Sequence, residues 1–441
     1  MMNLIKIKSG VLLLLLFGVM VQDINAQEVW SLDKCIETAV NNNKKLRLER
    51  NNVKIGKEKK RQVKSNLMPK VKLEADYKYF IELPYQLMPM SVFGGPEGQF
   101  KEAQFGVPHN INANLQFALP LYNPQIKSNV DMAKIGIEIA ELKYQKTEEQ
   151  LYFDISNLYY NAQILLSQIE FIDSNLKNSK KLHDNIKLLK DNKLATGTDV
   201  DKISLQMLQL NTRKEIVSSK YEQVLNGMKI LMGVSMDEKF DVEPNIEYRA
   251  ESQYTTRPTL DVRLVETKDK LLKSQLKSLK KSELPSVMLY GSYGTVGYGY
   301  DKSPNEFLNF YAMGFAGIKA SYNLFDGKIT KKKKNIKKIE IENNALQLDL
   351  LKDQNNLKIK NAELKIAIAR RTVEMSKSQI DYAKSIYDKT VLQQKQGLAS
   401  INDVLMSDNT LREAQQNYLS AIVEYLKADL ELKQLSGNIL K

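Results

Sequence analysis

Residues 70–81 read Lys-Val-Lys-Leu-Glu-Ala-Asp-Tyr-Lys-Tyr-Phe-Ile. From position 70 to 79 a charged side chain stands at every even position and an apolar or aromatic one at every odd position. This period of two is typical of a β-strand that has one face in an apolar environment. About 9–11 residues are enough for a tilted strand to cross a bilayer. The stretch therefore predicts a membrane strand over 70–81.

Three further stretches predict strands of the same kind. Residues 109–119 alternate apolar side chains with asparagine and glutamine, whereas 285–300 and 308–322 are rich in Gly, Ala and Tyr. The glycines favour close backbone approach or strong curvature. A soluble antiparallel sheet with one wet face is the alternative. The charge on the polar face and the wide separation of the four strands argue against that alternative.

The chain contains an internal repeat. Matching residues recur at a constant offset of 204 positions: Leu194-Ala195-Thr196 with Leu398-Ala399-Ser400, Asp199-Val200 with Asp403-Val404, Tyr221 with Tyr425, and Gly233 with Gly437. We therefore predict two structural repeats, 27–240 and 241–441, each with a helix, two strands and a long helical hairpin. A period near two hundred residues indicates duplication of a whole unit, not a solenoid.

Four strands cannot close a membrane barrel, because single-chain bacterial barrels begin at about eight strands. Open strand edges are not tolerated in lipid. If the strands span a membrane, copies of the chain must join in a ring. Two copies would supply eight strands and three would supply twelve, which leaves room for a pore. This arithmetic favours three or more copies without selecting three.

Very long helices follow the second strand of each repeat. Between Asn123 and Lys190 the only helix-breaking residues are Pro124, at the start, and Gly136, which allows about 100 Å of helix. Residues 326–396 are similar. Apolar side chains form coiled-coil seams at 151–176 and 373–387. Each long helix ends at a tight turn, 191–198 or 397–402, and a second helix then returns to Gly233 or Gly437. A soluble coiled coil explains the seams equally well, but it does not explain the strands.

The first 26 residues match a signal peptide. Lys6 and Lys8 precede the apolar run 11–17, and small residues lead to a cleavage site that we place after Ala26. A retained membrane anchor is the alternative. The single cysteine, Cys35, cannot form an internal disulfide, and we interpret it as a buried helix residue.

Charge and composition give little support to other functions. The net charge of +13 becomes +12 without residues 1–26, and the lysines are mixed with nearly as many acids, so we expect no nucleic-acid partner. Only two histidines occur, His109 and His183, and no phosphate-binding loop is present. We therefore expect no cofactor, no metal, no catalytic residues and no enzymatic activity. The lysines at 331–338 could meet lipid headgroups, although a solvated face is an alternative.

An ordered set of motifs resembles the TolC-like outer-membrane efflux protein family over nearly all of the mature chain. The motifs are an opening helix from Trp30 to Asn43, helix-to-strand junctions at 67–69 and 284–285, strand-to-helix junctions at 121–122 and 324–327, Arg257-Pro258, and the turn 397–404. The loop 93–100 is similar to loops of family members from Bacteroidetes.

This resemblance implies an α+β membrane protein in the outer membrane. Four strands per subunit would give a twelve-stranded β-barrel in a homotrimer, continued by a periplasmic α-helical barrel. It also implies a periplasmic adaptor, or membrane fusion protein, and through it an inner-membrane pump. The chain would be the passive, gated conduit of a tripartite efflux or type I secretion system. A non-conducting envelope scaffold or adhesin built on the same helical hairpins is the alternative.

The resemblance also implies two kinds of site. Asp199 and Asp403 fall on positions of acidic rings that narrow the periplasmic mouth, although N-capping explains both aspartates equally well. The next acidic position is Met406 here, and Asp408 lies nearby but out of register. The adaptor-docking tip would comprise Lys193, Leu194, Ala195, Thr196, Gly397, Leu398, Ala399 and Ser400.

Overall fold

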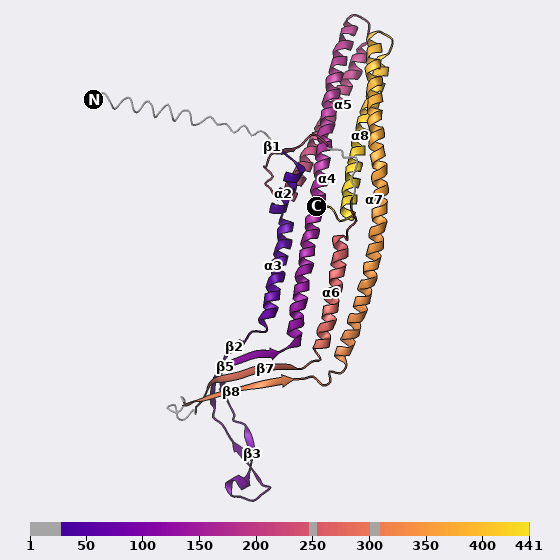
Figure 1. The fold of residues 1–441 in the computed structure, drawn as a ribbon. Coiled ribbons are helices and arrows are strands. Elements are labelled where there is room, and N and C mark those ends of the chain that lie inside the picture. The colour runs from indigo at the N-terminus through magenta and orange to yellow at the C-terminus, as the bar shows by residue number, and fades with distance from the viewer. Residues whose placement is uncertain (1–27, 247–253, 300–308, 441) are drawn as a thin grey trace, which may run out of the picture. The chain divides into compact units, whose positions relative to one another are not determined.

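The computed structural model describes residues 28–246, 254–299 and 309–440 (Figure 1). The predicted signal peptide, and the ends of two predicted strands at Tyr300 and Leu308, lie outside these residues. The chain forms two compact units. One, here the helical unit, comprises Met1–Glu49, Tyr144–Leu260 and Lys352–Lys441; the other, the sheet unit, comprises Arg50–Lys143 and Asp261–Leu351. Each unit thus takes segments from both predicted repeats.

The sheet unit contains one four-stranded antiparallel sheet. Its strands are β2 (Lys70–Tyr79), β5 (His109–Tyr122), β7 (Ser286–Gly299) and β8 (Asn309–Ser321), in the order β2-β5-β7-β8. All four predicted strands are therefore present, and β2 and β8 are the two edges. One row across the sheet reads Leu73, Leu115, Tyr293 and Gly314, whereas the next begins with Glu74 and Asn114. The alternation in the sequence thus gives an apolar face and a face that is polar along β2 and β5.

Strand bounds differ from the predicted ones by a few residues. β2 ends at Tyr79, so that Phe80 makes the last backbone bond to Pro108, at 2.8 Å, and Ile81 lies outside the strand. β5 continues past Leu119 to Tyr122, with an irregular register after Pro120, which has no N–H to donate.

The strand glycines allow close approach, as the sequence predicted. A Cβ on Gly294 would lie 2.2 Å from the carbonyl oxygen of Ala113, and one on Gly314 would lie 2.7 Å from the Tyr293 ring. No side chain fits at either position without displacing its neighbour. These glycines therefore let adjacent strands and an aromatic ring pack tightly.

Four helices lie in a row in the sheet unit. They are the parts of α3 (Lys44–Ser65), α4 (Pro124–Asp191), α6 (Leu260–Lys281) and α7 (Ile329–Lys395) that belong to this unit. Gly56 of α3 packs on Ile137 of α4, Lys270 of α6 contacts Glu138 of α4 at 2.7 Å, and Asn344 of α7 donates to a carbonyl of α6 at 3.1 Å.

Both long helices were predicted almost to their ends. The side-chain oxygen of Asn123 accepts from the N–H groups of residues 125 and 126, so α4 starts at Pro124. α7 starts at Ile329, three residues later than predicted, because the Asp326 carboxylate accepts from the Thr330 N–H at 2.8 Å. Each aspartate or asparagine satisfies N–H groups that the helix itself cannot.

A short hairpin connects β2 and β5 and was not predicted. It pairs β3 (Tyr85–Pro89) with β4 (Phe100–Gln104) and turns through the 3-10 helix η1 (Met90–Phe93). Gly94 closes this turn with φ 79°. The segment has no alternation of apolar and polar residues, so its pairing is not visible in the sequence.

The helical unit packs α2 (Leu32–Asn42), α5 (Gly197–Met232) and α8 (Ile401–Leu435) against the remaining parts of α4 and α7. The predicted seams lie in this packing. Ile155 and Ala162 of the first seam are fully buried, as are most of Val373, Ala383 and Tyr387 in the second. Cys35 is fully buried in α2, as predicted, and burial raises the pKa of its thiol to about 12.

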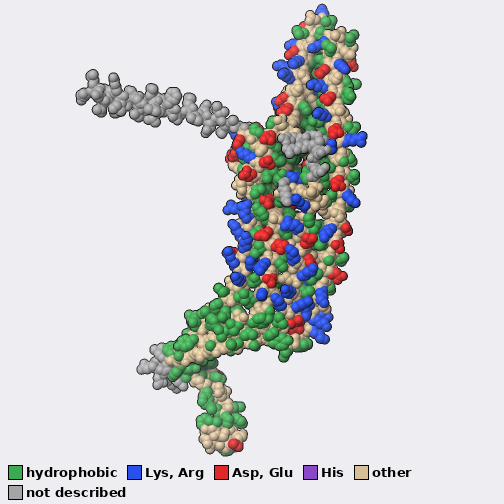
Figure 2. Space-filling model, in the orientation of Figure 1, with side chains coloured by type: hydrophobic (Ala, Val, Ile, Leu, Met, Phe, Trp, Pro, Cys, Tyr) green, Lys and Arg blue, Asp and Glu red, His purple; other side chains and the backbone are tan. Residues whose placement is uncertain are grey.

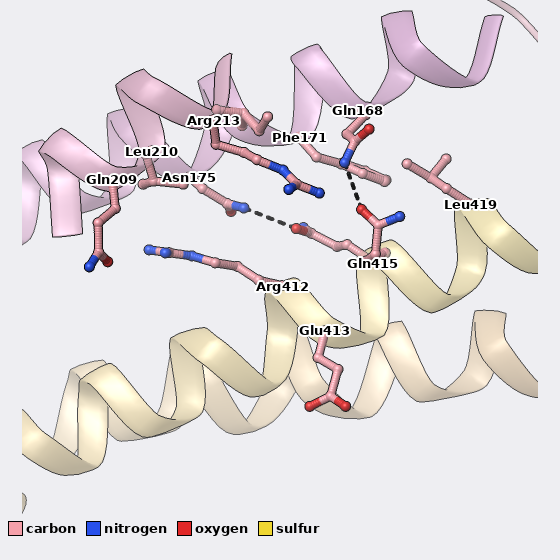
Figure 3. Close-up of a pocket in the computed structure, with 12 residues that line it drawn as sticks. Gln168, Phe171, Asn175, Gln209, Leu210, Arg213, Arg412, Glu413, Gln415 and Leu419 are labelled. Atoms are coloured by element: carbon pink, nitrogen blue, oxygen red, sulfur yellow. Dashed lines mark hydrogen bonds between the residues drawn. The ribbon is translucent and has the colours of Figure 1, made fainter. Parts of the chain in front are cut away.

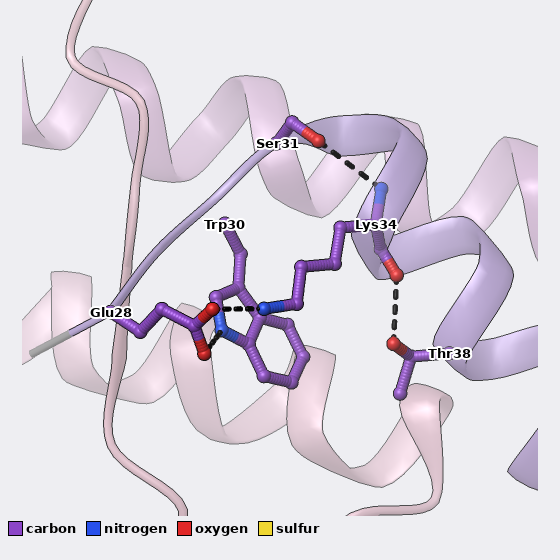
Figure 4. Close-up of polar contacts among 5 residues, drawn as sticks. All are labelled: Glu28, Trp30, Ser31, Lys34 and Thr38. Carbon is purple, nitrogen blue, oxygen red and sulfur yellow. Dashed lines mark hydrogen bonds and ion pairs between the residues drawn. The ribbon is translucent and has the colours of Figure 1, made fainter.

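A two-stranded parallel sheet ties the start of the described chain to this unit, and it corrects the predicted opening helix. β1 (Glu28–Trp30) pairs with β6 (Phe240–Val242), so Trp30 is a strand residue that stacks on Phe240 at 4.8 Å. Figure 4 shows Lys34 and the Trp30 indole meeting the Glu28 carboxylate, while Ser31 caps α2. Tyr159 of α4 donates to the Trp30 carbonyl at 3.0 Å.

Among the described helices, none combines the length and the apolar character that a membrane-spanning helix requires.

Candidate functional site: the tip turns and the contacts between the hairpins

Two turns of matching geometry join α4 to α5 and α7 to α8. Lys193 and Gly397 occupy the left-handed position after each long helix, with φ of 62° and 75°. The next N–H, from Leu194 or Leu398, donates to a carbonyl five residues earlier, at 2.8 and 2.9 Å. This is a Schellman motif in both turns. It leaves the leucine side chains 74% and 76% exposed.

Each turn passes directly into a capping box. Thr196 Oγ1 accepts from the Asp199 N–H at 3.2 Å, and the Asp199 carboxylate accepts from the Thr196 N–H at 3.1 Å. Ser400 and Asp403 repeat the arrangement at 3.2 and 2.8 Å. These hydrogen bonds hold the pKa of both carboxyl groups below the ordinary value of 3.8. The two aspartates are therefore ionised helix caps at neutral pH.

The structure brings the two turns together. Apolar side chains from both hairpins meet in one cluster: Ala195, Val200 and Ile203 from the first, Ile401 and Val404 from the second, with Leu182, Ile186, Ala383 and Tyr387. Beside it, the Lys202 ammonium donates to the Asn402 side-chain oxygen at 2.9 Å. All eight predicted tip residues lie in these two turns. Ala195 and Ala399 are half-buried, and the other six are exposed.

Farther from the turns, polar side chains join the hairpins (Figure 3). Asn175 of α4 donates to Gln415 of α8 at 3.0 Å, and Gln168 donates to Gln416 at 2.6 Å. They border a cavity of about 300 Å³ that Arg213 of α5 also lines. A neutral hydrogen bond contributes only about 1 kcal/mol net, so these contacts separate at modest cost.

A buried ionic cluster between the turns and this cavity was missed. Asp408 is 4% exposed, accepts from the Gln206 amide of α5, and forms an ion pair with Arg412 on the next turn of α8. Burial raises its pKa above the ordinary value, although Arg412 and Gln206 oppose the shift. Asp408 therefore joins two hairpins and is not exposed at a mouth. Its spacing of four residues from Arg412 was the available signal.

No protein-family model matches the sequence, and no curated protein sequence matches it. Solved structures do. The outer membrane protein VceC of Vibrio cholerae is 16% identical with a TM-score of 0.72, over 92% of this chain and 96% of that chain. The outer membrane channel CmeC of Campylobacter jejuni is 13% identical, TM-score 0.71, over 92% and 85%. The open MtrE outer membrane channel of Neisseria gonorrhoeae is 15% identical, TM-score 0.68, over 92% and 89%.

The chain therefore has the fold of outer-membrane channel proteins over nearly all of its length. The fold is TolC-like, which confirms the resemblance that the sequence motifs carry.

Proposed function

We propose that the chain is one subunit of an outer-membrane export channel, a passive and gated conduit that works with a periplasmic adaptor and an inner-membrane pump. Three copies would combine their strands into a twelve-stranded barrel and their hairpins into a periplasmic tunnel. The shared fold supports a channel role, because the similar structures are channel proteins and not enzymes. It also supports a location in the outer membrane, which the predicted signal peptide would allow the chain to reach.

The open-edged sheet carries this proposal. β2 and β8 have no further strand partner among the described residues. Val71 and Leu73 on β2 are 62% and 71% exposed, and Ile318 on β8 is 68% exposed. An apolar sheet with free edges is stable neither in water nor in lipid. Because β2 and β8 run in opposite directions, β2 of one copy can continue the antiparallel order beside β8 of the next.

An unpaired apolar seam along α7 supports an oligomer through the helices. Six side chains at steps of four and seven residues are 53–74% exposed: Leu357, Leu364, Ile368, Met375, Tyr382 and Ile386. This is the spacing of a coiled-coil seam, and it lies apart from the buried seam that contains Val373 and Ala383. A second copy of the chain is the occupant that matches its length and period.

The polar contacts between the hairpins support gating. Near the tips the hairpins share one apolar cluster, but beyond it they join through amide pairs and the Asp408 ion pair. Outward movement of one hairpin would exchange these bonds for bonds to water. Asp199 and Asp403 would form rings of carboxylates in an oligomer while they cap their helices, and rings of this sign favour cations. Leu194 and Leu398 would offer exposed apolar points for an adaptor.

Single-channel conductance in planar bilayers tests the proposal. The wild-type protein should insert and show a small, cation-selective conductance. In the double variant Asp199→Ala/Asp403→Ala, the conductance should rise or lose its selectivity. The exposed pair Asp349→Ala/Asp353→Ala, elsewhere on α7, is a control of equal charge change. Folded protein that neither inserts nor conducts would support the scaffold or adhesin alternative. An unchanged conductance would restrict both aspartates to helix capping.

A further inference from the structure

The helix ends that adjoin the sheet hold a large excess of basic residues. Residues 57–65 at the end of α3 hold five basic residues and one acidic residue, and 273–283 around the end of α6 hold four and one. Residues 328–338 at the start of α7 hold seven basic and no acidic residues. These three segments, here the basic collar, carry a larger positive excess than the +13 of the whole chain.

Much of this charge is exposed and is not neutralised by the chain. Arg61 pairs with Glu58, and Lys334 pairs with Glu283 at 2.6 Å. The following lysines are exposed and form no ion pair within the described residues: Lys57, Lys64, Lys280, Lys331, Lys332 and Lys333. Like charges at this density repel one another, so an anionic surface placed against them would stabilise the arrangement.

The side chains of the sheet unit change in a fixed order from strand to helix. The sheet presents exposed apolar side chains, and the junctions that follow carry exposed Tyr122, Tyr322 and Phe325. The basic collar begins within the next turns of helix. Figure 2 shows hydrophobic side chains over the sheet and lysines and arginines over the helix ends that join it. Hydrocarbon, interfacial aromatic and cation is the order of environments across one membrane leaflet.

We propose that the basic collar binds the headgroups of anionic phospholipids in the leaflet that faces the helices. The inference rests on the proposed function, because it requires the sheet to span the membrane. The lysine ammonium groups would contact headgroup phosphates while the aromatic side chains lie at the level of the glycerol backbone. Each lysine close to an anionic surface strengthens association about fivefold. The α7 segment, with seven lysines in eleven residues, should dominate.

Lipid selectivity of the reconstituted full-length protein tests the proposal. Spin-labelled phosphatidylglycerol and spin-labelled phosphatidylcholine would be compared in phosphatidylcholine vesicles by electron paramagnetic resonance. We expect severalfold preferential association of phosphatidylglycerol at low salt, which weakens as the salt concentration rises. The variant Lys331→Gln/Lys332→Gln/Lys333→Gln should lose most of the preference. These lysines are exposed, so the substitutions should leave folding intact.

The matched control is Lys177→Gln/Lys180→Gln/Lys181→Gln, three exposed lysines of α4 in the helical unit, which should retain the preference. Conductance of each variant separates the two proposals. A conducting channel without lipid preference, or with equal preference in both variants, would overturn the collar and leave the channel. A wild-type protein that does not insert would overturn both. If phosphate abolishes the preference where chloride of equal ionic strength does not, the lysines form a site for free phosphate and not a lipid surface.

Discussion

Removal of the Asp408 carboxylate should loosen the contact between α5 and α8. In Asp408→Ala the buried Gln206 amide loses a charged acceptor, which costs about 1.5–3 kcal/mol for a bond of this kind. Loss of one partner from a fully buried ion pair costs about 3–5 kcal/mol. The Arg412 side chain is 21% exposed, so water recovers part of that penalty. We expect a net loss of about 2–3 kcal/mol in local stability.

Hydrogen–deuterium exchange measures this loss as the opening free energy of residues 200–210 and 401–412. The exposed Asp381→Ala on α7 is the control, with an expected change within about 0.5 kcal/mol. The apolar triple variant Asp408→Leu/Arg412→Met/Gln206→Leu should be close to neutral, because no buried polar group remains unpaired. The reasoning is refuted if Asp408→Ala opens no more easily than the control, or if the triple variant opens as easily as Asp408→Ala.

Four substitutions test the local geometry. Thr196→Ala and Ser400→Ala should each cost about 1 kcal/mol at the start of a tip helix, measured by amide exchange of that turn. In the unsubstituted protein the cap carboxyls have folded pKa values below 3.8, so their contribution is full above pH 3.8 and is lost as the pH falls through the folded pKa; exchange at the tips that is independent of pH between 5 and 2 would contradict this. Lys193→Gly should stabilise the first turn by about 1 kcal/mol, because a non-glycine residue leaves the left-handed region, and faster exchange there would contradict it. Gly294→Ala should prevent stable sheet formation, whereas Gly136→Ala, in a helix with open space around it, should raise the melting temperature; equal effects in thermal unfolding would be inconsistent with the packing.

The sequence predicts those elements whose pattern is local. The alternation at 70–79 is complete within one strand, and the absence of helix breakers from 125 to 190 is enough to predict α4. The caps at Asp199 and Asp403 were equally visible, because Thr or Ser three residues before an acid is a local signal. The remaining question, whether the same carboxylates narrow a pore, concerns a neighbouring copy and cannot be read from one chain.

The elements that were missed depend on distant partners. β1 and β6 have three residues each and come from opposite ends of the first predicted repeat, so neither shows a strand pattern alone. Trp30 joins β1 because Phe240 and Tyr159 surround it, not because of its neighbours in sequence. Asp408 looks like any helical acid until Gln206 of α5 is placed against it. In each case tertiary contacts decide where the side chain lies.

The central claim is that neighbouring copies close the sheet into a barrel by pairing β2 with β8. Cysteine cross-linking in membranes tests it most directly, with Ala75→Cys on β2 combined in turn with Ala312→Cys, Ala316→Cys or Ala320→Cys on β8 of the same chain. Cys35 is buried and serves as the internal control in Ala75→Cys alone. The account predicts covalent oligomers up to three copies for at least one pair and none for the control. Membrane-inserted protein that remains monomeric on non-reducing gels with every pair would contradict it.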